Sequence, residues 1–308
     1  MRDTQFTFIE APIHQGQKHY GVSLGSSFIR QSLIDQNFDF TNVFLKAKQQ
    51  FGRVNLEAYE QLSYLVEIEA RKENLIFTAG GDHSLSLGSI QGLLRVNPDL
   101  KVIWIDAHGD INTRNTSTTG SFHGMPLSFL LGADKLQGEI WIENFIKPEN
   151  LIYFGVRDLD PEEKLFLERH QIRHYSVENI NSRGVSEVIA EISSAVQGSQ
   201  VHFSVDSDAF DPAIAPSTGV PVAGGITYSC AYKLIKSVLA VAQVKSYEYV
   251  ELNPQIFTNQ FDVFNTAQIG IDLFSLILKN FNQRTEIKYG RNDRQRHSTK
   301  PNLLHTYF

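Results

Sequence analysis

The sequence predicts a three-layer α/β/α fold in which helices cover both faces of a mostly parallel sheet. Six short segments are apolar almost throughout instead of alternating with polar residues, which is typical of strands buried on both faces. Most of them are separated by longer segments with helical periodicity, and this alternation of strand and helix is the pattern of an α/β protein.

The elements follow from these two periodicities. The expected strands, in chain order, are 7–13, 74–80, 101–107, 150–156, 200–206 and 244–252. The expected helices lie near 55–72, 85–95, 160–171, 184–197 and 227–242. Neither an internal repeat nor a linker divides the chain, so we expect one domain over 1–308, with a core over about 5–280.

The C-terminal extension, 281–308, differs in character. Its first 20 residues, FNQRTEIKYGRNDRQRHSTK, carry six Lys or Arg against two acids. A basic tail can bind nucleic acid or membrane. A solvated extension or a subunit contact is the simpler interpretation, and we favour it.

Composition excludes several classes of protein. The chain of 308 residues has a formal net charge of −6, whereas a nucleic-acid-binding domain needs a basic face. Cys230 is the only cysteine, so neither an intrachain disulfide nor a thiolate metal cluster can form. No signal-peptide core or run of membrane-spanning length is present. We therefore expect a cytoplasmic protein that binds neither nucleic acid nor membrane.

Ionisable side chains follow four of the expected strands. In open parallel sheets, functional groups lie just beyond the carboxyl ends of the strands. Residues two apart in an extended chain point the same way, so acids at this spacing converge. The four strand ends carry, in turn, Asp82 and His83; Asp106, His108 and Asp110; Asp206 and Asp208; and Glu251.

These groups predict a metal centre. Burying several carboxylates without a compensating charge is costly. Oxygen and imidazole ligands without sulfur suit Mn²⁺ better than structural zinc, although Zn²⁺, Co²⁺, Ni²⁺ and Fe²⁺ stay open, and the surplus of carboxylates favours two ions. A single Asp after a strand is usually a turn or helix cap, which is an alternative for Asp82 and Asp211. The predicted ligands are His83, Asp106, His108, Asp110, Asp206 and Asp208.

Four sequence blocks together resemble the ureohydrolase superfamily. They run in order through about 75–275, as GGDHS (80–84), DAHGDINT (106–113), SVDSDAFDPAIAPSTGVPVAGG (204–225) and VELNP (250–254). Two further segments are similar to the arginase branch, namely TSTTGSFHGMP (116–126) after DINT, and FGVRDLDPEE (154–163). The resemblance implies the arginase/deacetylase-like fold and a homo-oligomer, trimeric or hexameric.

The resemblance also implies a binuclear manganese centre that hydrolyses L-arginine to L-ornithine and urea. A hydroxide bridging the ions would attack the guanidinium carbon. Asp106 and Asp206 would bridge the two ions. One ion would be held by these two with His83 and Asp110, and the other by these two with His108 and Asp208.

Further roles are implied for residues around the ions. Glu251 would hold the guanidinium, since a carboxylate can make two charge-assisted hydrogen bonds to it. His123 would shuttle protons, which suits an imidazole near neutral pH. The predicted catalytic residues are thus His123, Glu251 and Asp110. The α-carboxylate would be read by Asn112, Thr119 and Ser121, and the α-ammonium by Asp160 and Glu163, although Asp-Pro-Glu-Glu also makes an ordinary helix start.

Three positions depart from the arginase pattern. The loop has Thr119-Gly120-Ser121 where Ser-Gly-Asn is common, Arg114 stands where a proline is common, and Val220 replaces a threonine. Loss of that threonine hydroxyl would weaken binding by about 1 kcal/mol if it made one net hydrogen bond. We expect these changes to affect substrate affinity more than the type of reaction.

Other functions compete with arginase activity. An agmatinase, a guanidinobutyrase or another amidino hydrolase of the same superfamily would have no use for groups that read an amino-acid head. A deacetylase would favour one zinc ion, fewer carboxylates and a tyrosine near the intermediate. A non-catalytic binding protein with this fold would be expected to have lost at least one ligand, and the ligand set is complete.

Overall fold

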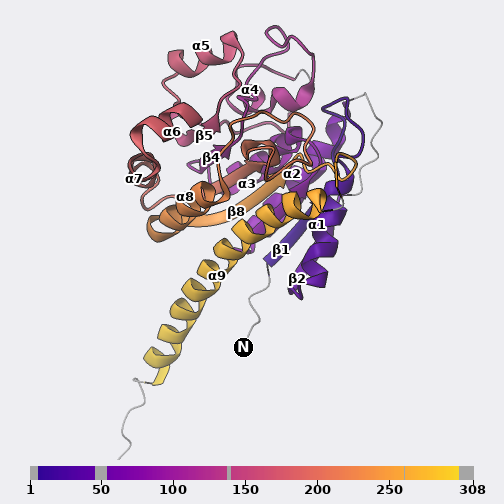
Figure 1. Ribbon diagram of the computed structural model, residues 1–308. Helices are drawn as coiled ribbons and strands as arrows, with labels where there is room; N and C mark the ends of the chain where they lie inside the picture. Colours follow the sequence, from indigo (N-terminus) through magenta and orange to yellow (C-terminus); the bar gives the residue numbers. More distant parts are fainter. Residues whose placement is uncertain (1–5, 46–53, 137–139, 260, 298–308) are drawn as a thin grey trace, which may run out of the picture.

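A single sheet forms the centre of the molecule (Figure 1), seen in a computed structural model that describes residues 6–45, 54–136, 140–259 and 261–297. Within these residues, eight strands pair in the order β2-β1-β3-β8-β7-β4-β5-β6, and every neighbouring pair is parallel. The strands are β1 Phe6–Ala11, β2 Phe40–Phe44, β3 Ile76–Gly80, β4 Lys101–Ile105, β5 Leu151–Val156, β6 Arg173–Ser176, β7 Gln200–Asp206 and β8 Gln243–Val250.

Helices cover both faces of the sheet, so the predicted three-layer α/β/α fold is confirmed. One hydrophobic core lies between the sheet and α1 Leu24–Asp35, α6 Val177–Arg183, α7 Val185–Ala195, α8 Tyr228–Val241 and the start of α9 Asp262–His297. A second core lies between the opposite face and α2 Leu56–Arg71, α3 Ser86–Val96, α4 Pro126–Leu130 and α5 Pro161–Arg169. Short 3-10 turns are η1 His83–Leu85, η2 Phe122–Gly124, η3 Pro148–Asn150 and η4 Ser207–Ala209.

Each of the six expected strands is present, and two further strands lie at the edges of the sheet. β2 and β6 are short, and both are partly exposed. An edge strand buries little of its surface, so it lacks the continuous apolar run that marks a central parallel strand. The five expected helices correspond to α2, α3, α5, α7 and α8, whereas α1, α4, α6 and α9 were not expected.

Helix α9 continues through position 281, where we expected an extension to begin. Its first turns pack Phe274 and Ile277 into the core. The rest of the helix extends away from the body of the molecule (Figure 1), and Ile287 is 57% exposed. The boundary between core and extension is therefore the departure of a continuous helix from the body, rather than a break in the chain.

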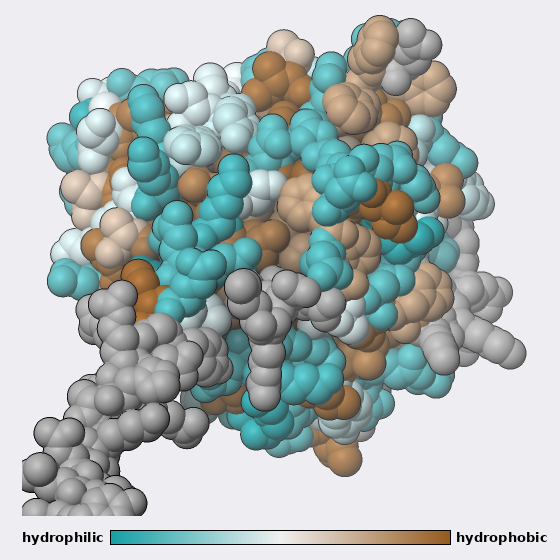
Figure 2. Space-filling view, turned by 90° about the horizontal axis from the view of Figure 1, so that it is seen from below, coloured by the Kyte–Doolittle hydropathy of each residue, from teal (hydrophilic) through white to brown (hydrophobic). Residues whose placement is uncertain are grey.

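The surface seen from below mixes hydrophilic and hydrophobic residues (Figure 2). Folded proteins generally expose much apolar area, so interspersed apolar residues need no special explanation. Among the helices that the structure describes, none combines the length and the apolar character that crossing a membrane requires.

The four central strands determine where the functional groups meet. β3, β8, β7 and β4 are consecutive neighbours, paired through Ala79–Tyr249, Tyr249–Val205 and Val205–Ile105. Because all four are parallel, their carboxyl ends lie side by side at one edge of the sheet. The four ionisable segments of the sequence therefore converge there.

Candidate metal centre

Three carboxylates surround one nitrogen of His83. The side chain is fully buried at the start of η1, and its Nδ1 atom lies 2.9 Å from Asp106 Oδ2, 3.1 Å from Asp110 Oδ2 and 3.0 Å from Asp206 Oδ2. The four residues come from the ends of β3, β4 and β7. One imidazole nitrogen facing three carboxylate oxygens matches the ligand set expected for a divalent cation.

A second group of ligand atoms adjoins the first. His108 Nδ1 lies 3.2 Å from Asp208 Oδ2 and 3.5 Å from Asp106 Oδ1. Asp106 thus presents one carboxylate oxygen to each histidine, as a bridging ligand would, and it belongs to both clusters that could hold an ion. Asp206 contacts His83 and accepts a hydrogen bond of 2.8 Å from the backbone of Asp208.

The protein alone compensates the charges of this cluster unevenly: against the effect of burial, His108 and His83 keep the pKa of Asp106 below its usual value, whereas three other carboxylates have raised pKa values. Burial, and then the charge of Asp106, raise the pKa of Asp110 and raise that of Asp208 to about 6. The pKa of Asp206 is raised well above its usual value by burial and by the charges of Asp208 and Asp106. Several buried carboxylates this close together repel one another when they are ionised. Divalent cations bound among them would offset this repulsion, so the raised pKa values are consistent with a metal site.

Residues outside the predicted set contact the candidate ligands and the segments that carry them. The Trp104 ring stacks on His83 at a centroid distance of 4.0 Å, and its Nε1 donates to Asp106 Oδ2 at 2.9 Å. Arg157 donates to the carbonyl oxygens of Asp208 and Val222, both at 2.7 Å. It thereby joins the strand-end loop of β5 to the segment that carries Asp208. Asp82, by contrast, caps η1 through the backbone of Ser84, as the alternative interpretation predicted.

Two functional candidates have left-handed backbones. Asp110 has φ of 50° and Glu251 has φ of 64°, a region that residues with side chains seldom adopt. The Asp110 carbonyl accepts from Leu127 N at 3.0 Å, and Glu251 N donates to Gly81 O at 2.8 Å. Such conformations persist where the surrounding structure enforces them, and they cluster at functional sites.

Glu251 lies beside the ligand cluster, and three groups hold it in place. Its Oε1 accepts from His83 N at 2.9 Å and lies 3.1 Å from His123 Nδ1, while Oε2 accepts from Gln17 Nε2 at 2.5 Å. Although burial favours the neutral ring, the hydrogen bond and charge of Glu251 raise the pKa of His123 to about 9. Gln17 was not predicted, because a glutamine 234 residues away in the chain carries no local signal.

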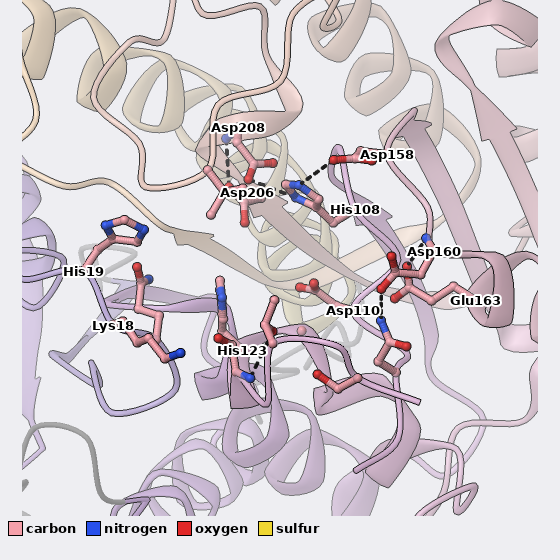
Figure 3. Close-up of a pocket in the computed structure, with 17 residues that line it drawn as sticks. Lys18, His19, His108, Asp110, His123, Asp158, Asp160, Glu163, Asp206 and Asp208 are labelled. Carbon is pink, nitrogen blue, oxygen red and sulfur yellow. Dashed lines mark hydrogen bonds and ion pairs between the residues drawn. The ribbon is translucent and has the colours of Figure 1, made fainter. Parts of the chain in front are cut away.

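A cavity of about 380 Å³ opens next to the cluster. His123 and Asp110 line this cavity. So do all five residues predicted to bind the α-carboxylate and α-ammonium groups of the substrate, namely Asn112, Thr119, Ser121, Asp160 and Glu163. Lys18 and His19 lie on one side, whereas Asp158, Asp160 and Glu163 lie on the other (Figure 3). Lys18, His19, Ser117 and Asp158 were not predicted to line the site, although Ser117 belongs to the same hydroxyl-rich loop as Thr119.

The two acids of the Asp-Pro-Glu-Glu segment have different surroundings. Both oxygens of Glu163 accept backbone N–H groups, one from Ile111 at 3.1 Å and the other from Asp160 at 3.0 Å. Burial is the main cause that raises the pKa of Glu163 to about 7. Asp160 keeps one carboxylate oxygen in a bond to Asn112. Both acids belong to the capping box of α5 and both line the cavity, but the two backbone bonds engage both oxygens of Glu163.

The departures from the arginase pattern occupy different places. Arg114 forms an ion pair with Asp134 at 2.7 Å and also donates to Lys135 O at 2.6 Å. Arg114 is not among the residues that line the cavity. Val220 does line the cavity, and it follows Gly219 in the chain.

Comparisons with known proteins agree with this geometry. A family model described as "Arginase family" matches residues 4–278. Rat arginase-2, described as mitochondrial, is 33% identical over 303 residues, covering 90% of this chain and 85% of the relative. The crystal structure of arginase from Bacillus subtilis superposes with a TM-score of 0.79 at 30% identity, covering 89% of this chain and 98% of that one.

A further structure, of Entamoeba histolytica arginase in complex with L-ornithine, superposes with a TM-score of 0.76 at 28% identity. It covers 90% of this chain and 99% of the other. The family match extends over both sides of the central sheet and includes each strand that carries a ligand candidate. The chain therefore belongs to the arginase family, in the arginase branch of the ureohydrolase superfamily.

Proposed function

We propose that the protein hydrolyses the guanidinium group of L-arginine to L-ornithine and urea with two manganese ions. The observation that carries this proposal is the pair of adjoining ligand clusters that share Asp106. They open onto a cavity that is also lined by Asn112 and Asp160, groups suited to an amino-acid head. The solved L-ornithine complex of a relative with the same fold supports the assignment.

The donor set fits two hard divalent cations. His83, Asp106, Asp110 and Asp206 would hold one ion, and His108, Asp106, Asp206 and Asp208 would hold the other. Imidazole and carboxylate donors without sulfur favour Mn²⁺, with Co²⁺, Ni²⁺, Zn²⁺ or Fe²⁺ as substitutes. Ions bound here would supply a water nucleophile of lowered pKa and positive charge beside the carbon under attack.

The protein's own residues would position the substrate. A carboxylate has about four lone-pair positions, and the protein occupies three of those on Glu251. The remaining position, on Oε2, can accept one N–H group of a guanidinium, and a second N–H can bond Oε1 where it displaces the ring of His123. That pairing would fix the planar group beside the ligand cluster.

His123 would move protons between solvent and the reacting nitrogen. Its ring is mostly buried at the cavity wall, with Nδ1 toward Glu251. In the protonated form it can give its proton to the departing amine, after which it regains a proton from solvent. Asn112, Thr119 and Ser121 would bind the α-carboxylate, while Asp160, with a smaller contribution from Glu163, would bind the α-ammonium.

An agmatinase or guanidinobutyrase is the alternative within the family. Those substrates lack the α-amino acid head, so they would leave Asn112 and Asp160 without a ligand. The test is a urea-release assay on metal-depleted protein reloaded with Mn²⁺, Co²⁺ or Zn²⁺, run on L-arginine, agmatine, 4-guanidinobutyrate and formimidoylglutamate. We expect arginine to be preferred, and Asn112→Ala to reduce that preference. Rapid turnover of agmatine without turnover of arginine would overturn the proposal.

Three broader expectations remain predictions of the same proposal. We predict one domain over 1–308, assembly into a trimer or hexamer, and a cytoplasmic location. The mammalian relatives named as mitochondrial make the last of these worth a direct test by cell fractionation. Light scattering on the purified full chain tests the oligomer.

A further inference from the structure

A buried carboxylate that the proposed mechanism does not use lies beneath the metal centre. Glu248, on β8, is fully buried between the sheet and α3. Its Oε1 accepts from Ser204 Oγ at 2.6 Å and from Ser86 Oγ, and its Oε2 accepts from Ser89 Oγ at 2.5 Å. Three hydroxyl groups thus direct their protons toward one carboxylate.

One of these hydroxyls connects Glu248 to a predicted metal ligand. Ser204 Oγ lies 2.8 Å from Nε2 of His83, whose other nitrogen faces the carboxylates of the metal site. A hydroxyl has a single proton. Because Ser204 gives that proton to Glu248, its oxygen can only accept from His83, so the proton of a neutral His83 ring lies on Nε2. The Nδ1 lone pair is then free for a cation.

Glu248 is suited to enforce this direction because it is an acceptor only. Although burial favours the neutral acid, the charge of His202 and hydrogen bonds from His202, Ser204 and Ser86 lower the pKa of Glu248 to about 2. The Nε2 atom of His202 lies 3.4 Å from the carboxylate. An ionised carboxylate has no proton to give, so it cannot reverse the hydrogen bond from Ser204.

The other histidine of the metal site lacks such a connection. His108 Nε2 lies 3.8 Å from Asp158 Oδ2, which is beyond hydrogen-bonding distance, and the Asp158 side chain is 66% exposed. In metalloproteins, the group that binds the second nitrogen of a histidine ligand fixes its tautomer and its ring orientation. Among the described residues, His83 has a fully buried hydrogen-bond partner at its second nitrogen, Ser204, whereas His108 has none.

We propose that Glu248 is a positioning residue that acts through Ser204 to hold His83 in the Nε2–H tautomer, the form that binds a divalent cation. The inference rests on the proposed metal centre and adds a residue to it. It explains why a charged side chain is retained inside the sheet, where an apolar residue would be easier to bury.

The central test is Glu248→Gln, which keeps the size of the side chain but adds N–H donors. The amide can donate to Ser204, which then turns its proton toward His83 and favours the wrong tautomer. We expect one of the two Mn²⁺ ions to bind about 10–100-fold more weakly, with the other changed less. The measurement is calorimetric titration of Mn²⁺ into the metal-depleted full chain. The matched control is Glu69→Gln, also a buried glutamate with a hydroxyl partner, Thr7, but distant in the fold.

Ser204→Ala tests the route of the effect and also serves if the glutamine variant does not fold. It should weaken the same ion, and Glu248→Gln should then add no further loss in the double variant, because both changes break one connection. Additive losses would indicate a general structural effect and would overturn the proposal. Unchanged binding of both ions by a folded Glu248→Gln variant would overturn it as well.

A direct reading of the tautomer completes the test. In Zn²⁺-loaded protein, ¹⁵N chemical shifts of His83 distinguish a protonated Nε2 from a protonated Nδ1. We expect Nε2–H in the wild-type chain, whereas a proton on Nδ1 would contradict the inference. Wild-type protein that binds no divalent cation would remove the proposed metal centre and this inference together, an outcome that differs from a failure of the variants alone.

Discussion

The side-chain amide of Asn112 donates a 2.8 Å hydrogen bond to Asp160 and accepts one of 2.9 Å from the hydroxyl of Thr116. The first bond joins a residue proposed to bind the α-carboxylate to one proposed to bind the α-ammonium. The second bond fixes which end of the amide faces Asp160, because a hydroxyl donor selects the amide oxygen. One N–H of the amide then remains for an anionic group in the cavity.

Thr116→Val tests whether the orientation of this amide sets substrate preference. Valine has the shape of threonine but no hydroxyl, so the amide of Asn112 is free to rotate. We expect KM for L-arginine to rise about fivefold, as for the loss of one hydrogen bond, with kcat nearly unchanged. Agmatine, assayed as substrate and as inhibitor, is the control, since it lacks the carboxylate. Equal weakening of both ligands would contradict a role in reading the amino-acid head.

Val220→Thr tests the departure from the family pattern that removes a hydroxyl from the cavity lining. Val220 is 36% exposed at the wall next to Gly219, and a Cβ placed on that glycine would lie 3.8 Å from Glu251 Oε2. A hydroxyl here can bond the guanidinium or its carboxylate partner. We expect KM for L-arginine to fall about fivefold. Val220→Ala, which changes volume without adding a hydroxyl, should leave KM unchanged or higher, and a fall with alanine would argue against the hydroxyl as the cause.

The convergence of the candidate metal ligands could be predicted because much of it depends on local patterns. Asp106, His108 and Asp110 follow a continuous apolar strand at a spacing of two, and parallel strands bring their carboxyl ends to the same edge. The adjacency of β3, β8, β7 and β4, on which the convergence depends, is a property of topology and not of any one segment. The resemblance to the arginase branch supplied the pairing of ligands that the spacing alone left open.

The residues that support the ligands could not be predicted in the same way. Trp104, Arg157 and Gln17 act through contacts with partners distant in the chain, and each would pass for a core or surface residue in its own segment. Arg157 is a clear case. An arginine after a strand is common at a protein surface, and only the folded structure shows that it donates a hydrogen bond to the carbonyl oxygen of Val222. The left-handed backbone of Glu251 is likewise imposed by its tertiary surroundings, because its own residue type disfavours it.

The pairing of His123 with Glu251 predicts a measurable pKa in the metal-depleted protein. The ring pKa is raised to about 9, so stability from this pair is fully present below the ordinary histidine pKa of 6.5 and is lost as the pH rises through 9. Histidine NMR titration should show His123 still protonated at pH 8. Glu251→Gln should lower its pKa, because the hydrogen bond and the charge of Glu251 are the leading causes that raise it. An unchanged His123 titration in this variant would refute the pairing.

Asp208→Asn should stabilise the metal-depleted protein while reducing the stability that it gains from bound metal. Burial and the charge of Asp106 raise the pKa of Asp208 to about 6 from 3.8, so the folded state holds this proton more tightly than the unfolded state. The stability that goes with the proton is complete below pH 3.8 and disappears as the pH rises through 6. Asparagine cannot ionise, so the Asp208→Asn variant does not lose this stability as the pH rises.

At pH 8 without metal, we therefore expect the Asp208→Asn variant to unfold about 5 °C above the wild type in differential scanning fluorimetry. At pH 4 the difference in unfolding temperature between the variant and the wild type should nearly vanish, because Asp208 is then largely protonated in the folded wild type. A difference caused by better packing would persist at this pH. Saturating Mn²⁺ should reverse the order, because the wild type gains stability from bound ions and the variant has lost a ligand. A variant no more stable than wild type at pH 8, or one that gains as much from Mn²⁺, would show that Asp208 is neither charge-strained nor a ligand.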